Sequence, residues 1–153
     1  MGASTPSQYE SQYERALESL GWSGKGRAAF QSALDVHRLL SEGIEGSAIR
    51  RLAACYDLTQ EDLTRLLGIK KRTLQRREQE ARLPSGETDR LWRAAVILAE
   101  ATDILGSRAK ASSWLHRENR ALGGARPLDM IRTEAGYEEV RNVLGRIEWG
   151  VWS

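Results

Sequence analysis

The sequence contains few of the residue types from which enzyme and metal sites are built. Among its 153 residues there is one cysteine, Cys55, so an internal disulfide is excluded. Cys55 lies in the apolar stretch 52–56, where we expect a small buried hydrophobic side chain. The two histidines, His37 and His116, stand isolated among helical residues. Because no His, Cys and carboxylate groups occur at ligand spacing and no reactive constellation is visible, we expect no metal, no cofactor and no enzyme activity.

Long apolar runs and targeting segments are also missing. No apolar run approaches the ~18 residues that a transmembrane helix needs, and residues 1–22 lack the basic and apolar regions of a signal peptide. We therefore expect a cytoplasmic protein that does not contact membranes. With 41% apolar and 29% charged residues, the composition is that of an ordinary globular protein.

Apolar residues at helical spacing are present almost throughout the chain. No segment alternates strictly between apolar and polar residues over the length of a strand, so we predict an all-α fold. Residues 1–26 are rich in Gly, Ser and polar residues, and we expect them to form a loosely attached arm with a short helix over 9–20.

Two helices are predicted between this arm and residue 58. The first, over about 26–41, would bury Phe30, Leu34 and Leu40. The second begins at Ser47, whose hydroxyl can cap it. We expect both helices to contribute to hydrophobic packing rather than to a functional site.

Residues 59–78 have the spacing of a helix-turn-helix. Thr59 can cap a short helix together with Asp62, Gly68 permits a left-handed turn, and Leu74 is placed to bury the following helix. The inner face of the first helix is formed by Leu63, Leu66 and Leu67, and Ile69 fills the corner.

The second helix of this motif presents a polar and basic outer face. Four of its side chains are spaced at i, i+3, i+4 and i+7: Arg72, Gln75, Arg76 and Gln79. Lys70 and Lys71 precede them, near where DNA phosphates would lie. Arg and Gln can read guanine and adenine edges through paired hydrogen bonds. We predict that these six residues contact DNA; the alternative is a merely solvated helix surface.

Charge is distributed unevenly along the chain. Residues 65–82 carry seven basic and two acidic side chains, a net charge of +5, although the whole chain carries only +2. From residue 134 onward, four acidic side chains outnumber two basic ones. A basic middle and a mildly acidic end suggest two different partners.

A long apolar helix is predicted to begin near Ser85 and to end at Gly106. It could complete the N-terminal domain, link that domain to the next, or form a homodimer seam, and periodicity alone does not choose between these roles. Residues 106–153 are then expected to form a compact module of short helices.

Two of the five tryptophans, Trp149 and Trp152, fall within the last seven residues. Exposed large apolar groups that gather in one place usually mark an interaction site, and Trp is enriched at binding hot spots. The alternative is that both rings fold back onto the core of this chain. We favour a partner that buries them.

Four stretches of the second half resemble, in order and spacing, the toxin-binding domain of the Xre/MbcA/ParS antitoxins. They are 111–115 (ASSWL), 119–128 (NRALGGARPL), 133–136 (TEAG) and 143–150 (VLGRIEWG). The stretch 49–105, with LGI at 67–69 and RTLQRR at 72–77, is similar to the Xre-like helix-turn-helix domain that precedes it. The resemblance divides the chain into the arm 1–26, a DNA-binding domain over 27–105 and a toxin-binding domain over 106–153.

This resemblance implies an antitoxin of the RES–Xre class. Its partner would be a RES-domain toxin, similar in fold to ADP-ribosyltransferases, that consumes NAD. The C-terminal end of the antitoxin would block the active-site cleft of the toxin, and the helix-turn-helix would repress the operon by binding operator DNA. The expected toxin-binding residues are Tyr137, Arg146, Ile147, Glu148, Trp149, Val151, Trp152 and Ser153.

A homodimer, or a larger hetero-oligomer with the toxin, is expected because helix-turn-helix proteins commonly read two half-sites. The other reading of the chain is a transcriptional regulator without a toxin, whose C-terminal module dimerises or binds an effector. Tight binding to a co-expressed NAD-consuming protein would decide between the two.

Overall fold

The computed structural model describes residues 8–22 and 32–150. Within these ranges the chain forms helices and no strand, so the prediction of an all-α fold is confirmed there. The helices are α1 (Gln8–Ser19), α2 (Ala33–Glu42), α3 (Ala48–Tyr56), α4 (Gln60–Leu67), α5 (Lys71–Arg77), α6 (Ser85–Leu105), α7 (Arg108–His116), the short 3-10 helix η2 (Arg120–Leu122), α8 (Pro127–Met130) and α9 (Glu134–Glu148). No helix of the described residues is long and apolar enough to cross a membrane.

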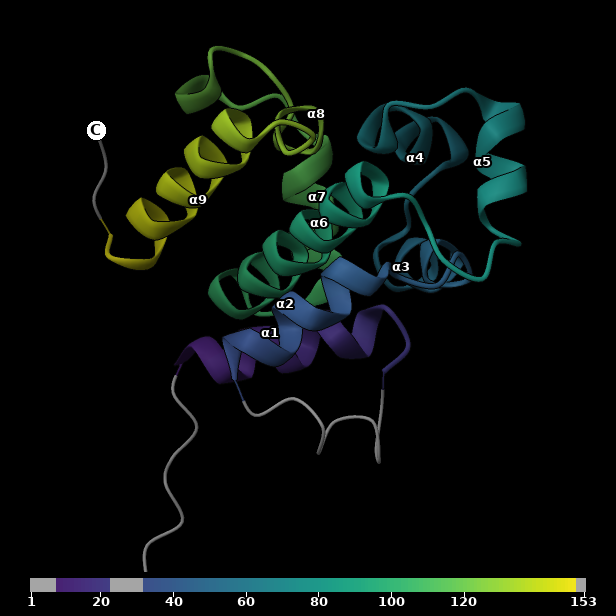
Figure 1. Cartoon of the computed structure of the whole chain (residues 1–153). Helices are drawn as coiled ribbons and strands as arrows, with labels where there is room; N and C mark the ends of the chain where they lie inside the picture. The colour runs from purple at the N-terminus through teal and green to yellow at the C-terminus, as the bar shows by residue number, and fades with distance from the viewer. Residues whose placement is uncertain (1–7, 23–31, 151–153) are drawn as a thin grey trace, which may run out of the picture.

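The longest helix, α6, runs through the middle of the molecule (Figure 1). Every side chain from 94 to 101 is buried, which is typical of a helix with neighbours on all sides. α1, α2, α4, α7 and α9 all pack against it. Of the three roles left open by the sequence, α6 therefore both completes the N-terminal domain and links it to the C-terminal helices, and its central apolar turns are not available as a homodimer seam.

The stretch expected to be a loose arm contains α1, which is part of the fold. Ala16, Leu17 and Leu20 are buried, and the ring of Tyr13 stacks on Trp92 with 5.7 Å between ring centroids. The expectation of loose attachment is therefore wrong for this helix. Its apolar face has the 3.6-residue spacing that a docked helix needs, although the surrounding polar sequence obscured it.

Two details of the next helices also differ from the sequence-based expectation. Leu34 is 54% exposed, because α2 instead turns Val36 inward; Phe30 lies outside the described residues. Ser47 does not cap α3, because its own backbone is already helical, whereas a capping residue is normally extended. Its hydroxyl is buried without a hydrogen-bond partner in the described part of the chain.

The C-terminal helices share one hydrophobic core with the N-terminal ones. Leu115 of α7, Leu128 of α8 and Leu144 of α9 are buried in the same cluster as Leu52 and Leu91. Pro127 occupies the first turn of α8, where its missing N–H costs no hydrogen bond. The two halves of the chain are thus held by common packing rather than by a linker.

Candidate functional site

The helix-turn-helix begins with the capping arrangement that the sequence predicts. The backbone N–H of Asp62 donates to Thr59 Oγ1 at 3.1 Å, and the backbone N–H of Thr59 donates to Asp62 Oδ2 at 2.9 Å. Two N–H groups at the start of α4 are thereby satisfied. The inner leucines of this helix, Leu63, Leu66 and Leu67, are buried as predicted.

The turn between α4 and α5 depends on glycine. Gly68 has φ +67° and ψ +34°, a left-handed conformation that L side chains rarely adopt. Ile69 is half-buried at the corner, and Leu74 is fully buried on the inner face of α5. This packing fixes the direction in which the opposite face of α5 points.

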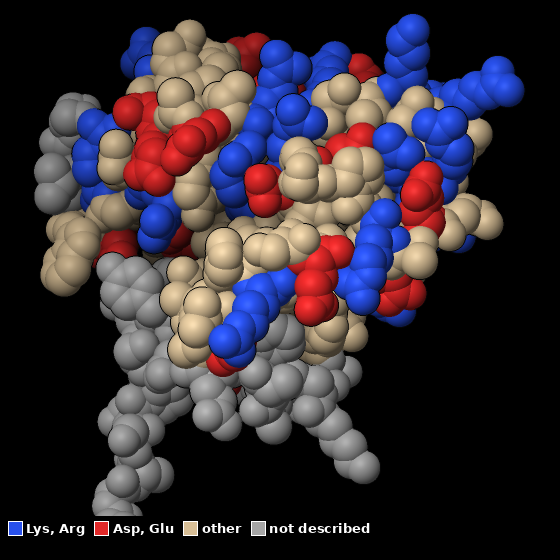
Figure 2. All heavy atoms as spheres, in the orientation of Figure 1, with Lys and Arg blue, Asp and Glu red and all other residues tan. Residues whose placement is uncertain are grey.

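That opposite face carries the side chains predicted to contact DNA. Lys70, Lys71, Arg72, Gln75 and Arg76 are all exposed. Figure 2 shows basic side chains gathered at the right of the molecule, where α5 lies. Gln79 is also exposed, but α5 ends at Arg77, so Gln79 lies in the following turn and not on the helical face that the i+7 spacing predicts.

Two residues of α6 hold the helix-turn-helix, one beside its turn and the other at the end of its second helix, and no local pattern in the sequence indicates them. Arg90 Nη1 donates to the carbonyl oxygen of Leu67 at 2.8 Å, beside the turn. Glu87 Oε2 accepts from Arg77 Nε at 2.7 Å, at the end of α5. Arg77 also contacts Glu80 at 3.0 Å. Arg77 is thus used to position α5 and is not part of its outer face.

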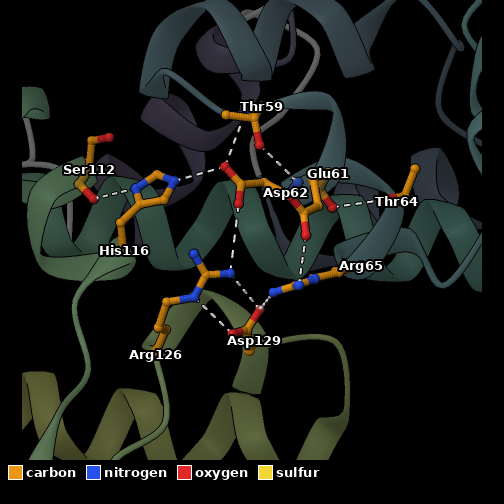
Figure 3. Close-up of polar contacts among 9 residues, drawn as sticks. All are labelled: Thr59, Glu61, Asp62, Thr64, Arg65, Ser112, His116, Arg126 and Asp129. Carbon is orange, nitrogen blue, oxygen red and sulfur yellow. Dashed lines mark hydrogen bonds and ion pairs between the residues drawn. The ribbon is translucent and has the colours of Figure 1, made fainter.

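A cluster of polar side chains, which we call the Asp62 junction, joins α4 to the C-terminal helices (Figure 3). Asp62 is 5% exposed, and its Oδ2 lies 2.8 Å from His116 Nε2 of α7. His116 Nδ1 lies 2.7 Å from the carbonyl oxygen of Ser112. Because carboxylate and carbonyl oxygens only accept hydrogen bonds, this geometry suits a ring whose two nitrogens both donate. The expectation that His116 is isolated is therefore wrong.

Arginine and aspartate side chains extend the Asp62 junction toward α8. Arg126 forms two hydrogen bonds to Asp129, of 2.9 and 3.0 Å, and its guanidinium lies 3.8 Å from Asp62 Oδ1. Arg65 of α4 bonds Glu61 at 2.7 Å and lies 3.8 Å from Asp129. The first helix of the DNA-binding motif is thus held by charges from the C-terminal helices.

The surroundings of Asp62 favour its ionised form. Burial opposes ionisation, but hydrogen bonds from the Thr59 backbone and from His116 outweigh it, and the pKa of Asp62 is lowered. The sequence could not reveal this arrangement, because His116 lies 54 positions away from Asp62 along the chain.

The inner face of α9 is built into the core. Val140 and Leu144 are fully buried, and Tyr137 and Ile147 are partly buried against them. Burial raises the pKa of Tyr137. Two of the residues expected to bind the toxin, Tyr137 and Ile147, therefore also serve the packing of this chain.

One ion pair fixes α9 against α6. Arg141 Nε lies 3.2 Å from Glu100 Oε2, and its guanidinium carbon lies 5.8 Å from the centroid of the Tyr137 ring. Burial raises the pKa of Glu100, although Arg141 works in the opposite direction. Glu100 is only 7% exposed, so its carboxylate is largely removed from water, whereas Arg141 is partly exposed.

The end of α9 is open to solvent. Trp149 is 80% exposed, so its ring does not fold back onto the core of this chain. Glu148 is exposed as well, and Arg146 is half-buried 3.7 Å from Glu139. The other residues expected to bind the toxin, Val151, Trp152 and Ser153, lie outside the described residues.

Comparisons with known proteins match two domain families to this chain. The antitoxin Xre-like helix-turn-helix domain matches residues 35–96, and the antitoxin Xre/MbcA/ParS C-terminal toxin-binding domain matches residues 100–150. The antitoxin Xre of Photorhabdus laumondii is 30% identical over 120 residues, which are 77% of this chain and 81% of the relative. The chain belongs to the Xre/MbcA/ParS family of antitoxins.

Other relatives carry similar names. The antitoxin Xre of Pseudomonas putida is 29% identical over 120 residues, covering 78% of this antitoxin and 74% of the relative. A Sphingobium protein named Prs ADP-ribosylating antitoxin is 23% identical over 147 residues, covering 85% and 92%. The two matched regions of the antitoxin meet inside α6, which is consistent with the shared core.

Proposed function

We propose that this antitoxin neutralises a RES-domain toxin that consumes NAD, and that it represses its own operon by binding operator DNA. The observation that carries the proposal is Trp149, an 80% exposed aromatic ring at the end of a helix whose inner face is fully used by the core. It lies in the region that matches the toxin-binding domain of the family.

The chemistry of the segment 148–153 suits the cleft of an NAD-consuming enzyme. Such a cleft accepts an anionic dinucleotide, so it offers basic side chains and apolar walls. Glu148 supplies a negative charge and Trp149 and Trp152 supply apolar area. One relative carries ADP-ribosylating in its name, and ADP-ribosylation consumes NAD. The segment would occupy the cleft and exclude the dinucleotide.

DNA binding is assigned to the outer face of α5. α5 and α9 lie at opposite sides of the molecule (Figure 1), so the antitoxin could hold toxin and DNA together. Two copies, as a homodimer or as a larger assembly with the toxin, would read two half-sites of one operator. Both partners would be met in the cytoplasm.

Co-expression tests this proposal directly. A RES-domain toxin produced alone should deplete cellular NAD and arrest growth, and the antitoxin should restore both and co-purify with the toxin. An antitoxin that binds its promoter but neither retains the toxin nor restores NAD would instead be a regulator without a toxin partner.

A further inference from the structure

Two glycines of α9 differ in what their surroundings require. A Cβ atom on Gly136 would collide with the carbonyl oxygen of Met130, so the close packing of α8 against α9 demands glycine there. Among the described residues, a Cβ atom on Gly145 would meet nothing within 4 Å beyond the backbone of its own helix and its chain neighbours. The fold described here offers no steric reason for glycine at position 145.

Glycine at position 145 lowers the stability of α9. It lies inside α9 with a helical backbone, where glycine is less favourable than alanine because it loses more conformational freedom on folding. Because glycine weakens this helix and relieves no contact with the other described residues, contact with a partner is a physical reason for its presence. The absent side chain leaves room for a partner to approach the helix backbone closely.

The surroundings of Gly145 support an external contact. Glu138, Asn142, Gly145 and Trp149 follow one another at spacings of four, three and four residues, so they share the outer face of α9. Glu138 and Asn142 are exposed, and Trp149 projects one turn beyond Gly145 with its ring 80% exposed. A position without a side chain therefore lies one helical turn before an exposed aromatic ring.

We infer that the outer face of α9 is a docking surface for the toxin, with Gly145 as the point where the toxin backbone approaches most closely. Trp149 would enter an apolar pocket of the toxin next to this contact. The inference rests on the proposed function and extends it, because it adds a helix face to the segment 148–153.

Continuity and charge both identify the toxin as the partner. The outer face of α9 leads directly into the segment 148–153, and the whole of α9 falls within the match to the toxin-binding domain. Glu134 and Glu138 are exposed on this helix, and Figure 2 shows acidic side chains gathered on the side of the molecule where α9 lies. These exposed acidic side chains complement the basic rim expected around a cleft for an anionic dinucleotide.

Gly145→Gln is the decisive variant, because its effects on stability and on binding should have opposite signs. Glutamine is a good helix former, so the Tm of the free full-length antitoxin should rise by about 2–4 °C. The added side chain should hold the toxin away from the helix, and the Kd for a catalytically inactive RES-domain toxin should rise about tenfold or more. A merely structural role for Gly145 predicts no such divergence.

Gly86 provides a matched control. It lies in the first turn of α6, and a Cβ atom there also meets nothing within 4 Å in the part of the chain that the structure describes. Gly86→Gln should leave the Kd for the toxin unchanged.

Three results would overturn the inference. An unchanged Kd for Gly145→Gln, with normal loss of binding in Trp149→Ala, would restrict the interface to the segment 148–153 and leave the proposed function standing. A dimer of the wild-type antitoxin that becomes a monomer in Gly145→Gln would show that the face binds a second copy of this chain. Failure of the wild-type antitoxin to bind the toxin would remove the proposed function itself.

Discussion

His116 Nε2 of α7 lies 2.8 Å from Asp62 Oδ2 of α4, so a side chain of the C-terminal helices contacts the carboxylate that also accepts a hydrogen bond from the backbone N–H of Thr59, the residue that caps α4. Asp62 thus has two tasks, since it satisfies the start of α4 and also accepts a hydrogen bond across the junction. Removing its charge should affect both.

Asp62→Asn is expected to lower the free energy of unfolding at pH 7 by about 1–3 kcal/mol, because the cap and a hydrogen bond to a charged group are weakened. The pKa of Asp62 is lowered in the folded protein from its ordinary value of 3.8. Its ionised form therefore stabilises the fold above pH 3.8, and that contribution is lost as the pH falls through the lower folded pKa.

Denaturant titrations of wild type and Asp62→Asn at several pH values between 7 and 3 check this. The two stabilities should converge as the pH falls. The control is Asp89→Asn, which alters an exposed carboxylate of α6 and should change little. A constant difference between wild type and Asp62→Asn across this pH range would contradict the role given to the charge.

Arg141→Met is expected to destabilise the fold at neutral pH by about 1–3 kcal/mol, a value reduced for the partial exposure of Arg141, because it leaves Glu100 buried without its counter-charge. The pKa of Glu100 is already raised by burial, and loss of Arg141 should raise it further. A buried carboxyl with a raised pKa is penalised as the pH rises through that pKa, so the destabilisation should shrink on acidification.

Thermal unfolding at pH 7 and below pH 4 measures this effect. The double variant Arg141→Met with Glu100→Gln should recover much of the stability, because no buried charge then remains. If the single variant were equally destabilised at both pH values, the lost packing of the arginine stem would be the cause instead.

The triple variant Arg72→Ala, Gln75→Ala and Arg76→Ala should abolish operator binding and leave toxin binding intact. Each base-reading contact is worth about 1–3 kcal/mol, and α5, which carries the three side chains, lies on the opposite side of the molecule from α9 (Figure 1).

Lys70→Ala or Lys71→Ala should instead weaken binding to all DNA sequences and reduce the salt dependence by about one ion per lysine. Gel-shift titrations at several salt concentrations distinguish these effects. Lys110→Ala removes an exposed charge from α7 and serves as the control. Unchanged promoter binding by the triple variant would show that the face is misassigned.

The elements whose signals are local could be predicted from sequence. The cap at Thr59, the glycine turn at Gly68 and the inner leucines of α4 depend on residues within a few positions of one another, and all three are confirmed. The contacts of His116 and Arg90 could not be predicted, because they join residues 54 and 23 positions apart.

Other predictions from local sequence patterns were wrong because tertiary packing overrode the local preference. Ser47 has the residue type of a helix cap but adopts a helical backbone itself, so its hydroxyl cannot act in that role. α1 has a polar sequence on the whole, yet it docks on α6, with Ala16 and Leu17 buried and Tyr13 stacked on Trp92. Sequence patterns alone do not show which neighbour will cover an apolar face.

The most direct test of the account is the affinity of Trp149→Ala for a catalytically inactive RES-domain toxin, measured by calorimetry beside the wild-type antitoxin. Because Trp149 is 80% exposed, the Tm of the free variant should not change. The Kd should rise at least about thirtyfold, which corresponds to ~2 kcal/mol for a tryptophan anchor at an interface, and protection against NAD depletion should be lost in cells. An unchanged Kd together with full protection would contradict the claim that the end of α9 binds and blocks the toxin.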